Sequence, residues 1–199
     1  MAKIIYLHGF QSAGSSTTAQ RLRRSLKGHD LLSPDIPVQP EQAMITMRNI
    51  AGTLRQGDIV VGTSQGAFYA QLFRGWHRLL VNPSFHSSGI MRRHCGERLP
   101  FHNSRKDGAT SFEVTERMCK KMEEIEARQF DPKFGFIAPW GDRPELVQAF
   151  FGLHDDVVNC KDEYLAHYTT FNDFEGGHRL DPDTTLALIL PAIRTLIRQ

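Results

Sequence analysis

The sequence is poor in cysteine, and the few cysteines that it has follow no pattern. There are three, Cys95, Cys119 and Cys160, an odd number without a Cys-x-x-Cys spacing. A disulfide framework needs paired cysteines, and a zinc signature needs its ligands at regular short spacings. The candidate ligands that cluster here are spaced too irregularly for such a signature: His86, His94, Cys95, His102 and Cys119. We therefore expect a reducing compartment and no metal site.

Long apolar runs and an excess of one charge are also missing. No stretch of about 18 apolar residues occurs, as a membrane-spanning helix would need. The apolar run in residues 1–7 ends too early, at His8-Gly9, to form the core of a signal peptide. With 24 basic and 22 acidic side chains, the formal net charge of +2 provides no broad footprint for nucleic acid or an anionic membrane. These absences predict a cytoplasmic protein that acts on a small molecule, and they leave its oligomeric state open.

What the sequence does contain is a series of short apolar runs separated by helix-compatible segments. The runs lie at 4–7, 31–32, 59–61, 79–81, 146–151 and 168–171. Their apolar residues are consecutive rather than alternating, as in strands of a parallel sheet that helices cover on both faces. The repeated strand and helix order predicts one α/β domain over residues 1–199, with a mostly parallel sheet of about six strands.

Helical spacing accounts for several of the segments between these runs. Residues 40–54 place four apolar residues at helical intervals: Met44, Met47, Ile50 and Leu54. At the end of the chain, Asp181-Pro182 can begin a helix that runs to about Arg198, because aspartate is a good cap and proline suits the first helical position. Its expected buried stripe is Leu186, Ile189, Leu190, Ile193 and Ile197.

One segment, at about residues 86–143, is longer than a plain crossover needs and predicts an insertion over the sheet edge. Within it, Ser111–Gln129 has the pattern of an amphipathic helix that Ser111 can cap. As a lid, this helix would bring Phe112, Met118 and Met122 to the substrate. As a simple cover for the sheet edge, it would bury them, and the sequence leaves both interpretations open.

The pentapeptide Gly62-Thr63-Ser64-Gln65-Gly66 matches Gly-x-Ser-x-Gly. Such a match arises by chance in roughly one chain in fifteen of this length, at average glycine and serine usage of about 7% each. Its context makes it specific, because an apolar strand precedes it and a helix-compatible segment, Ala67–Phe73, follows it. This strand, tight turn and helix are the elements that present a nucleophilic serine, here Ser64.

A serine hydroxyl becomes a good nucleophile only when a base accepts its proton, and that base needs a carboxylate to orient it. Among the nine histidines, His178 is the best candidate because it follows the last strand-like run in a glycine-rich loop. Two acids, Asp155 and Asp156, follow the preceding strand, and we favour Asp155 while Asp156 is better explained as a loop cap. The order serine, aspartate, histidine is that of α/β-hydrolases.

The tetrahedral intermediate of acyl transfer needs N–H donors for its oxyanion. One expected donor is the backbone of Gln65, directly after the nucleophile. The other should come from the loop after the first strand, His8-Gly9-Phe10-Gln11, where Phe10 is preferred and Gln11 is an alternative. His8 itself is expected to pack structurally.

These motifs, together with Val81-Asn82-Pro83 and Glu175-Gly176-Gly177-His178, resemble the small bacterial esterases of the YqiA/YcfP-like α/β-hydrolase family over most of the chain. The resemblance implies a trimmed α/β-hydrolase fold and carboxylesterase activity on short acyl esters without a cofactor. It implies that Ser64 is the nucleophile, Asp155 the acid and His178 the base. The long insertion departs from the family core, so substrate size is not carried over.

The leading hypothesis is a serine hydrolase that cleaves carboxylic esters or thioesters of small acyl groups through an acyl-enzyme, without nucleic-acid or membrane partners. The alternative is a catalytically inactive binding or scaffold protein, since a fold can persist after its chemistry is lost. The complete set Ser64, Asp155 and His178 favours the enzyme.

Overall fold

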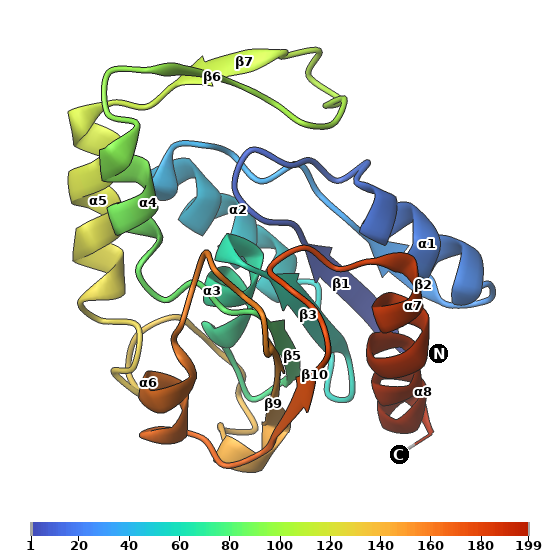
Figure 1. Ribbon diagram of the computed structural model, residues 1–199. Coiled ribbons are helices and arrows are strands. Elements are labelled where there is room, and N and C mark those ends of the chain that lie inside the picture. Colours follow the sequence, from blue (N-terminus) through green and yellow to red (C-terminus); the bar gives the residue numbers. More distant parts are fainter. Residues whose placement is uncertain (1, 199) are drawn as a thin grey trace.

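The computed structural model of the chain describes residues 2–198 and contains a six-stranded, wholly parallel sheet in the order β10-β9-β5-β3-β1-β2. The prediction of a parallel sheet of about six strands is confirmed (Figure 1). The strands are β1 (Lys3–Leu7), β2 (Asp30–Leu32), β3 (Ile59–Thr63), β5 (His77–Val81), β9 (Val147–Gly152) and β10 (Phe171–Phe174).

Helices cover both faces of the sheet, which explains why the strand interiors are apolar at consecutive positions. The helices are α1 (Thr17–Ser25), α2 (Pro40–Ala51), α3 (Gln65–Gln71), α4 (Ser87–Arg93), α5 (Glu116–Glu126), α6 (Lys161–Leu165), α7 (Pro182–Thr184) and α8 (Leu190–Ile197). Successive residues of β1 divide between two cores, with Ile5 packed on the α2 and α3 side and Ile4 on the α1 and α8 side. Each buried strand therefore stabilises both layers.

Two strands begin later than predicted. Strand β9 starts at Val147 because Leu146 belongs to a short 3₁₀ turn, η1 (Pro144–Leu146). Strand β10 starts at Phe171, and Tyr168 instead lies buried in the core after α6. The edge position of β10 leaves its first three residues exposed, so its sequence lacks a strong apolar signal.

The C-terminal helix begins as predicted, with the Asp181 carboxylate accepting the Thr184 N–H at 2.7 Å. The expected position of Leu186 on its buried stripe is wrong, because this side chain is 44% exposed. Residues Thr185–Ile189 form one π-helical turn, η2, which has a wider repeat than an α-helix. The wider turn shifts the buried face, and Thr185 is fully buried.

The insertion does not fold as expected from Ser111 onward. Residues Ser111–Glu113 form strand β7, which pairs antiparallel with β6 (Arg98–Pro100), and helix α5 starts only at Glu116. Its cap is Thr115, whose Oγ1 accepts the Met118 N–H at 3.3 Å, and not Ser111. A further small parallel pair joins β4 (Phe73–Arg74) to β8 (Phe136–Ile137).

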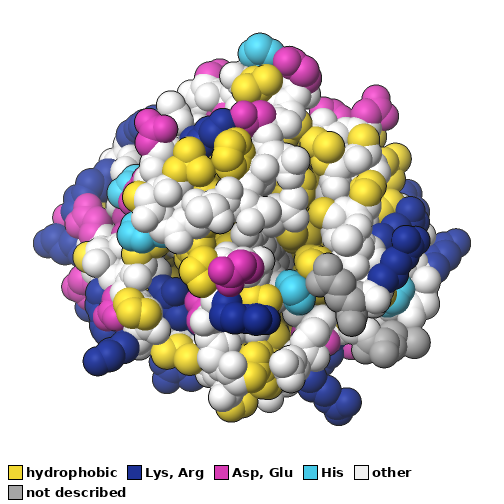
Figure 2. All heavy atoms as spheres, turned by 90° about the horizontal axis from the view of Figure 1, so that it is seen from below, with side chains coloured by type: hydrophobic (Ala, Val, Ile, Leu, Met, Phe, Trp, Pro, Cys, Tyr) yellow, Lys and Arg dark blue, Asp and Glu magenta, His cyan; other side chains and the backbone are white. Residues whose placement is uncertain are grey.

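The β6–β7 hairpin lies beyond the carboxyl ends of the sheet strands, over the loop that follows β1 (Figure 1). At the opposite end of the molecule, basic and acidic side chains are interspersed among small apolar areas (Figure 2). Within the described residues, no helix is both long enough and apolar enough to span a bilayer.

Candidate active site

Ser64 occupies a strained tight turn between β3 and α3. Its φ of 54° is in the left-handed region, which few non-glycine residues adopt. Glycine is required on both sides, since a Cβ on Gly62 would lie 2.3 Å from the Gly66 carbonyl oxygen and one on Gly66 would lie 2.1 Å from the Leu7 oxygen. The Ser64 N–H donates to the Val81 oxygen at 2.9 Å, which fixes the turn to the end of β5.

The structure brings the three predicted triad residues into one hydrogen-bonded chain. The Nε2 atom of His178 lies 3.0 Å from the Ser64 Oγ, and its Nδ1 lies 2.8 Å from Asp155 Oδ2. The Asp155 side chain is 6% exposed and the His178 side chain 17% exposed. By contrast, Asp156 is exposed to solvent. Asp155 is therefore the acid that contacts His178, and its orienting role stays a prediction.

The two carboxylate oxygens of Asp155 have different partners, and this difference orients the histidine. Oδ1 accepts the N–H groups of Val157 and Val158, at 2.9 and 3.0 Å, so only Oδ2 is directed at the imidazole. Because an ionised carboxylate can only accept, the proton of neutral His178 lies on Nδ1. The lone pair of Nε2 then faces the Ser64 hydroxyl, and this arrangement can remove its proton.

Three other histidines lie at the surface or in packing contacts, away from this hydrogen-bonded chain. His86 and His94 form exposed pairs with Glu163 and Glu97. His167 stacks on Phe130 with a ring separation of 3.8 Å. Among residues 2–198, no group of three or more His, Cys, Asp or Glu side chains is arranged to hold a metal ion.

The loop after β1 packs directly against the serine turn. A Cβ added at Gly9 would lie 3.2 Å from the Ser64 Cβ, so only glycine allows this approach without displacement. Across residues 2–198 the backbone N–H groups of Phe10 and Gln65 have no acceptor in the protein. Both N–H groups are therefore free to donate to a ligand, and their role as oxyanion donors stays a prediction.

His8 connects this loop to the backbone at Ile36. Its Nδ1 donates to the Gly9 oxygen at 2.9 Å, and its Nε2 accepts the Ile36 N–H at 3.0 Å. Burial lowers the pKa of His8 to about 4, so the ring stays neutral and can serve as donor and acceptor at once. The expected structural role of His8 agrees with these contacts.

The β6–β7 hairpin also bonds this loop, a contact that the sequence did not predict. The His102 N–H donates to the Gln11 oxygen at 2.8 Å, and Ser12 Oγ donates to Asn103 Oδ1 at 3.0 Å. The Phe10 ring packs edge to face on Phe112, with centroids 5.5 Å apart. The hairpin therefore supports the backbone that carries one candidate oxyanion donor.

The predicted substrate-contacting residues separate into two groups. Met118 and Met122 are fully buried in the core, so the expectation that they line a substrate site is wrong for this structure. The physical reason is that α5 turns its apolar face inward, where the Met122 sulfur accepts the Tyr69 hydroxyl. Phe112 instead lines an open groove of about 660 Å³ between the hairpin and residues 32–42.

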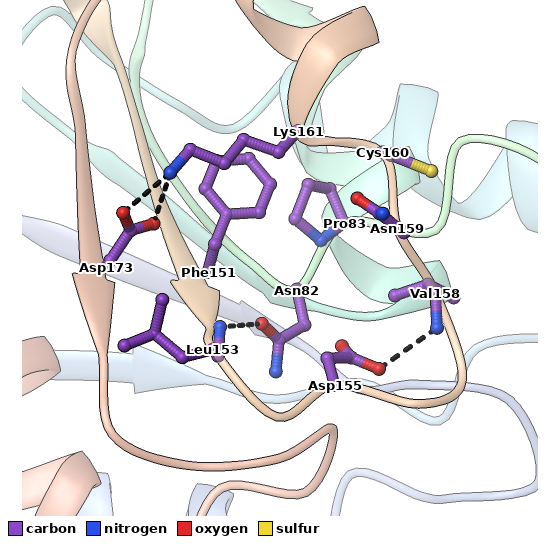
Figure 3. A pocket seen from close by; sticks show the side chains of 11 residues that line it. Asn82, Pro83, Phe151, Leu153, Asp155, Val158, Asn159, Cys160, Lys161 and Asp173 are labelled. Carbon is purple, nitrogen blue, oxygen red and sulfur yellow. Dashed lines mark hydrogen bonds and ion pairs between the residues drawn. The ribbon is translucent and has the colours of Figure 1, made fainter.

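A smaller cavity, of about 180 Å³, lies beside Asp155 (Figure 3). Its wall includes the Lys161–Asp173 ion pair and the side chain of Asn82, a residue to which the sequence assigned no role. Asn82 is only 2% exposed and follows β5 directly, at the sheet end where Ser64 and Asp155 also lie. Its place directly after a predicted strand is the sequence feature that marks Asn82 as a candidate site residue, although it does not identify the hydrogen-bond partners.

Comparison with known proteins gives one family and many similar structures. The uncharacterised protein family UPF0227 matches residues 3–178. The structure resembles mouse α/β hydrolase domain-containing protein 10, with a TM-score of 0.64, 15% identity and coverage of 98% of this chain and 89% of the other. For a monoacylglycerol lipase from Paleococcus ferrophilus the TM-score is 0.63, the identity 13% and the coverage 98% and 94%. Est1E from Butyrivibrio proteoclasticus matches with a TM-score of 0.64, 12% identity and coverage of 100% of this chain and 89% of the other. The α/β-hydrolase fold is thereby established.

Proposed function

This chain belongs to the uncharacterised protein family UPF0227 and has the α/β-hydrolase fold, and we propose that it is a serine hydrolase that cleaves carboxylic esters or thioesters of small acyl groups. The observation that carries the proposal is the hydrogen-bonded chain from Ser64 through His178 to Asp155 on a strained serine turn. Fold alone does not determine activity, so the argument depends on these three side chains.

In the proposed reaction, Ser64 Oγ attacks the acyl carbon while its proton passes to His178 Nε2. Asp155 stabilises the resulting imidazolium through Nδ1. The carbonyl oxygen becomes an oxyanion that accepts the N–H groups of Gln65 and Phe10. Collapse breaks the bond to the alcohol or thiol, which leaves with the proton from Nε2, and the acyl group remains on Ser64.

The second half of the proposed reaction uses water. His178 Nε2 removes a proton from a water molecule, whose oxygen attacks the acyl carbon of the acyl-enzyme. The second tetrahedral intermediate uses the same N–H donors, and its collapse returns the proton from His178 to Ser64 Oγ. The products are the carboxylic acid and the free enzyme.

Treatment with a fluorophosphonate probe tests the proposed function directly. We expect the probe to modify Ser64, as identified by mass spectrometry, and the unmodified protein to hydrolyse p-nitrophenyl esters or acyl thioesters from a panel of short acyl chains. Failure of the probe to react, together with no turnover on either panel, would favour a binding or scaffold role instead.

We further propose that the groove beside Phe112 receives the part of the substrate farther from the reacting bond. Its lining includes Leu32, Val38, Phe101 and Phe112, and Phe112 reaches the oxyanion loop through its contact with Phe10. Polar and charged side chains, among them Asp35, Arg105 and Lys106, also line the groove, and a wall that combines apolar surface with placed polar groups is typical of ligand sites. The groove thus supports an apolar acyl or alcohol group in the substrate.

Phe112→Ala should change the preference among acyl chain lengths, because it enlarges the groove next to Phe10. We expect altered ratios of kcat/KM across a series of p-nitrophenyl esters. Met118→Ala is the matched control, since Met118 is fully buried in the core. It should lower the free energy of unfolding by about 2–5 kcal/mol and leave these ratios unchanged. Unchanged ratios in Phe112→Ala would exclude the groove as the specificity site.

A further inference from the structure

Asn82 is the residue at which the loops carrying the three triad members meet. It follows β5 directly, and its φ of 44° is a left-handed conformation that asparagine tolerates better than most residues. Its N–H donates to the Phe150 oxygen on β9 at 2.9 Å. The preceding carbonyl, that of Val81, accepts the N–H of Ser64. The backbone on either side of Asn82 is thus tied to the strands that lead to the acid and to the nucleophile.

The side-chain amide of Asn82 bonds the loop that carries His178 and the start of the loop that carries Asp155. Nδ2 donates to the carbonyl oxygens of Gly177 and His178, at 3.0 and 3.1 Å. Oδ1 accepts the N–H of Gly152, where the acid loop begins, at 2.8 Å (Figure 3). Asn82 itself is 2% exposed and its three hydrogen bonds are partly buried, so leaving its amide unpaired would be costly.

These contacts fix the backbone on both sides of the histidine. The Gly177 and His178 carbonyls belong to the two peptide groups that flank the His178 Cα, so anchoring both restrains where the imidazole starts and how it is directed. The loop is also packed closely on the acid loop, since a Cβ on Gly152 would lie 2.6 Å from the Gly176 oxygen. A small displacement of this backbone would lengthen the contact between Nε2 and Ser64 Oγ.

Only a primary amide meets all three demands at this position. The site needs two N–H donors and one acceptor within a short side chain, which asparagine supplies. Reversing the amide would set its oxygen against two carbonyl oxygens and its NH₂ group against an N–H. An aspartate would keep the acceptor for Gly152 but would direct a second oxygen at the same two carbonyls.

We propose that Asn82 is a positioning residue that holds the His178 loop in register with Ser64 and Asp155. The proposal rests on the proposed serine hydrolase function. The Asn82 side chain bonds backbone groups of the histidine and acid loops, so in this proposal it acts through the peptide groups around His178.

Two substitutions test this role, Asn82→Gly and Asn82→Asp. Glycine accepts the positive φ and removes all side-chain hydrogen bonds, while aspartate retains the acceptor and loses both donors. Since a misplacement of about 1 Å can cost about a hundredfold in rate, we expect kcat to fall by about that factor, with KM close to the wild-type value. The rate of fluorophosphonate labelling should fall in parallel.

Proton NMR gives a readout that needs no turnover. The Nδ1–H of His178, held by Asp155, should give a resolved low-field resonance in the unmodified protein that shifts or broadens in both variants. Asn172→Asp is the matched control, because Asn172 is exposed on β10, where its Oδ1 accepts only the side chain of Gln148 at 2.7 Å. This control should leave kcat and the resonance unchanged.

The outcomes separate the two proposals. An unmodified protein that neither hydrolyses esters nor reacts with the probe would refute the proposed function, and the His178 resonance would still decide the role of Asn82. Wild-type kcat, or an unchanged resonance, in Asn82→Gly would overturn the positioning role. If Asn82→Gly unfolds below the assay temperature, Asn82→Asp decides. Unfolding of both would also contradict the proposal, because Asn82 would then be needed for folding itself.

Discussion

Ser64→Ala should reduce ester hydrolysis by about a millionfold while the protein stays folded. Loss of a triad nucleophile has an effect of this order in serine proteases, because no other group can form the acyl-enzyme. The fold should survive because alanine also has a Cβ, so the strained turn at φ 54° changes little. The substitution removes one partly buried hydrogen bond, that to His178.

The measurement is steady-state hydrolysis of the best p-nitrophenyl ester, together with thermal unfolding. Ser25→Ala, on helix α1, provides a control that removes a hydroxyl outside the candidate site. Its turnover should match that of the unmodified protein. A Ser64→Ala protein that keeps wild-type turnover would show that the nucleophile is another residue.

Asp155→Asn should lower kcat by about ten-thousandfold, as in the corresponding serine-protease variant. The structure supplies the reason. Two backbone N–H groups, of Val157 and Val158, point at one oxygen of Asp155, so an asparagine would place its carbonyl oxygen there. Its NH₂ group would then face His178 Nδ1 and would require Nδ1 to accept. The proton of the imidazole would move to Nε2, which could no longer take the proton of Ser64.

Asp156→Asn is the control for this prediction, because Asp156 is the adjacent acid and is exposed. Kinetics of both variants at saturating ester should show a severe defect only in Asp155→Asn. The reverse result, a severe defect in Asp156→Asn beside a mild one in Asp155→Asn, would assign the orienting role to the other aspartate.

The central strands and the serine turn could be predicted from the sequence because their signals are local. Consecutive apolar residues such as Ile59–Val61 mark a strand buried on both faces, and the glycines at 62 and 66 are needed by the turn itself. The edge strand β10 carries a weaker signal, since most of its side chains face solvent.

The insertion could not be predicted in detail because its structure depends on distant contacts. Residues 111–114 are short enough to fit either a helix or a strand, and the pairing with β6 and the contact of Phe112 with Phe10 select the strand. The burial of Met118 likewise depends on how α5 packs against α4 and α2. For the same reason, sequence alone could not show whether this helix is a lid.

The contacts of Asn82 could not be predicted from its local sequence because its three amide partners come from residues 152, 177 and 178. Nothing near position 82 in the chain specifies those partners. They meet only because β5 and β9 are neighbours in a parallel sheet whose carboxyl ends share one edge.

The residue after Asn82 has a consequence for the chemical ageing of the protein. Asparagine slowly converts to aspartate when the backbone nitrogen of the next residue loses its proton and attacks the side-chain amide. That next residue here is Pro83, and proline has no N–H to lose. The amide that joins the three loops is therefore protected from the commonest route of spontaneous deamidation.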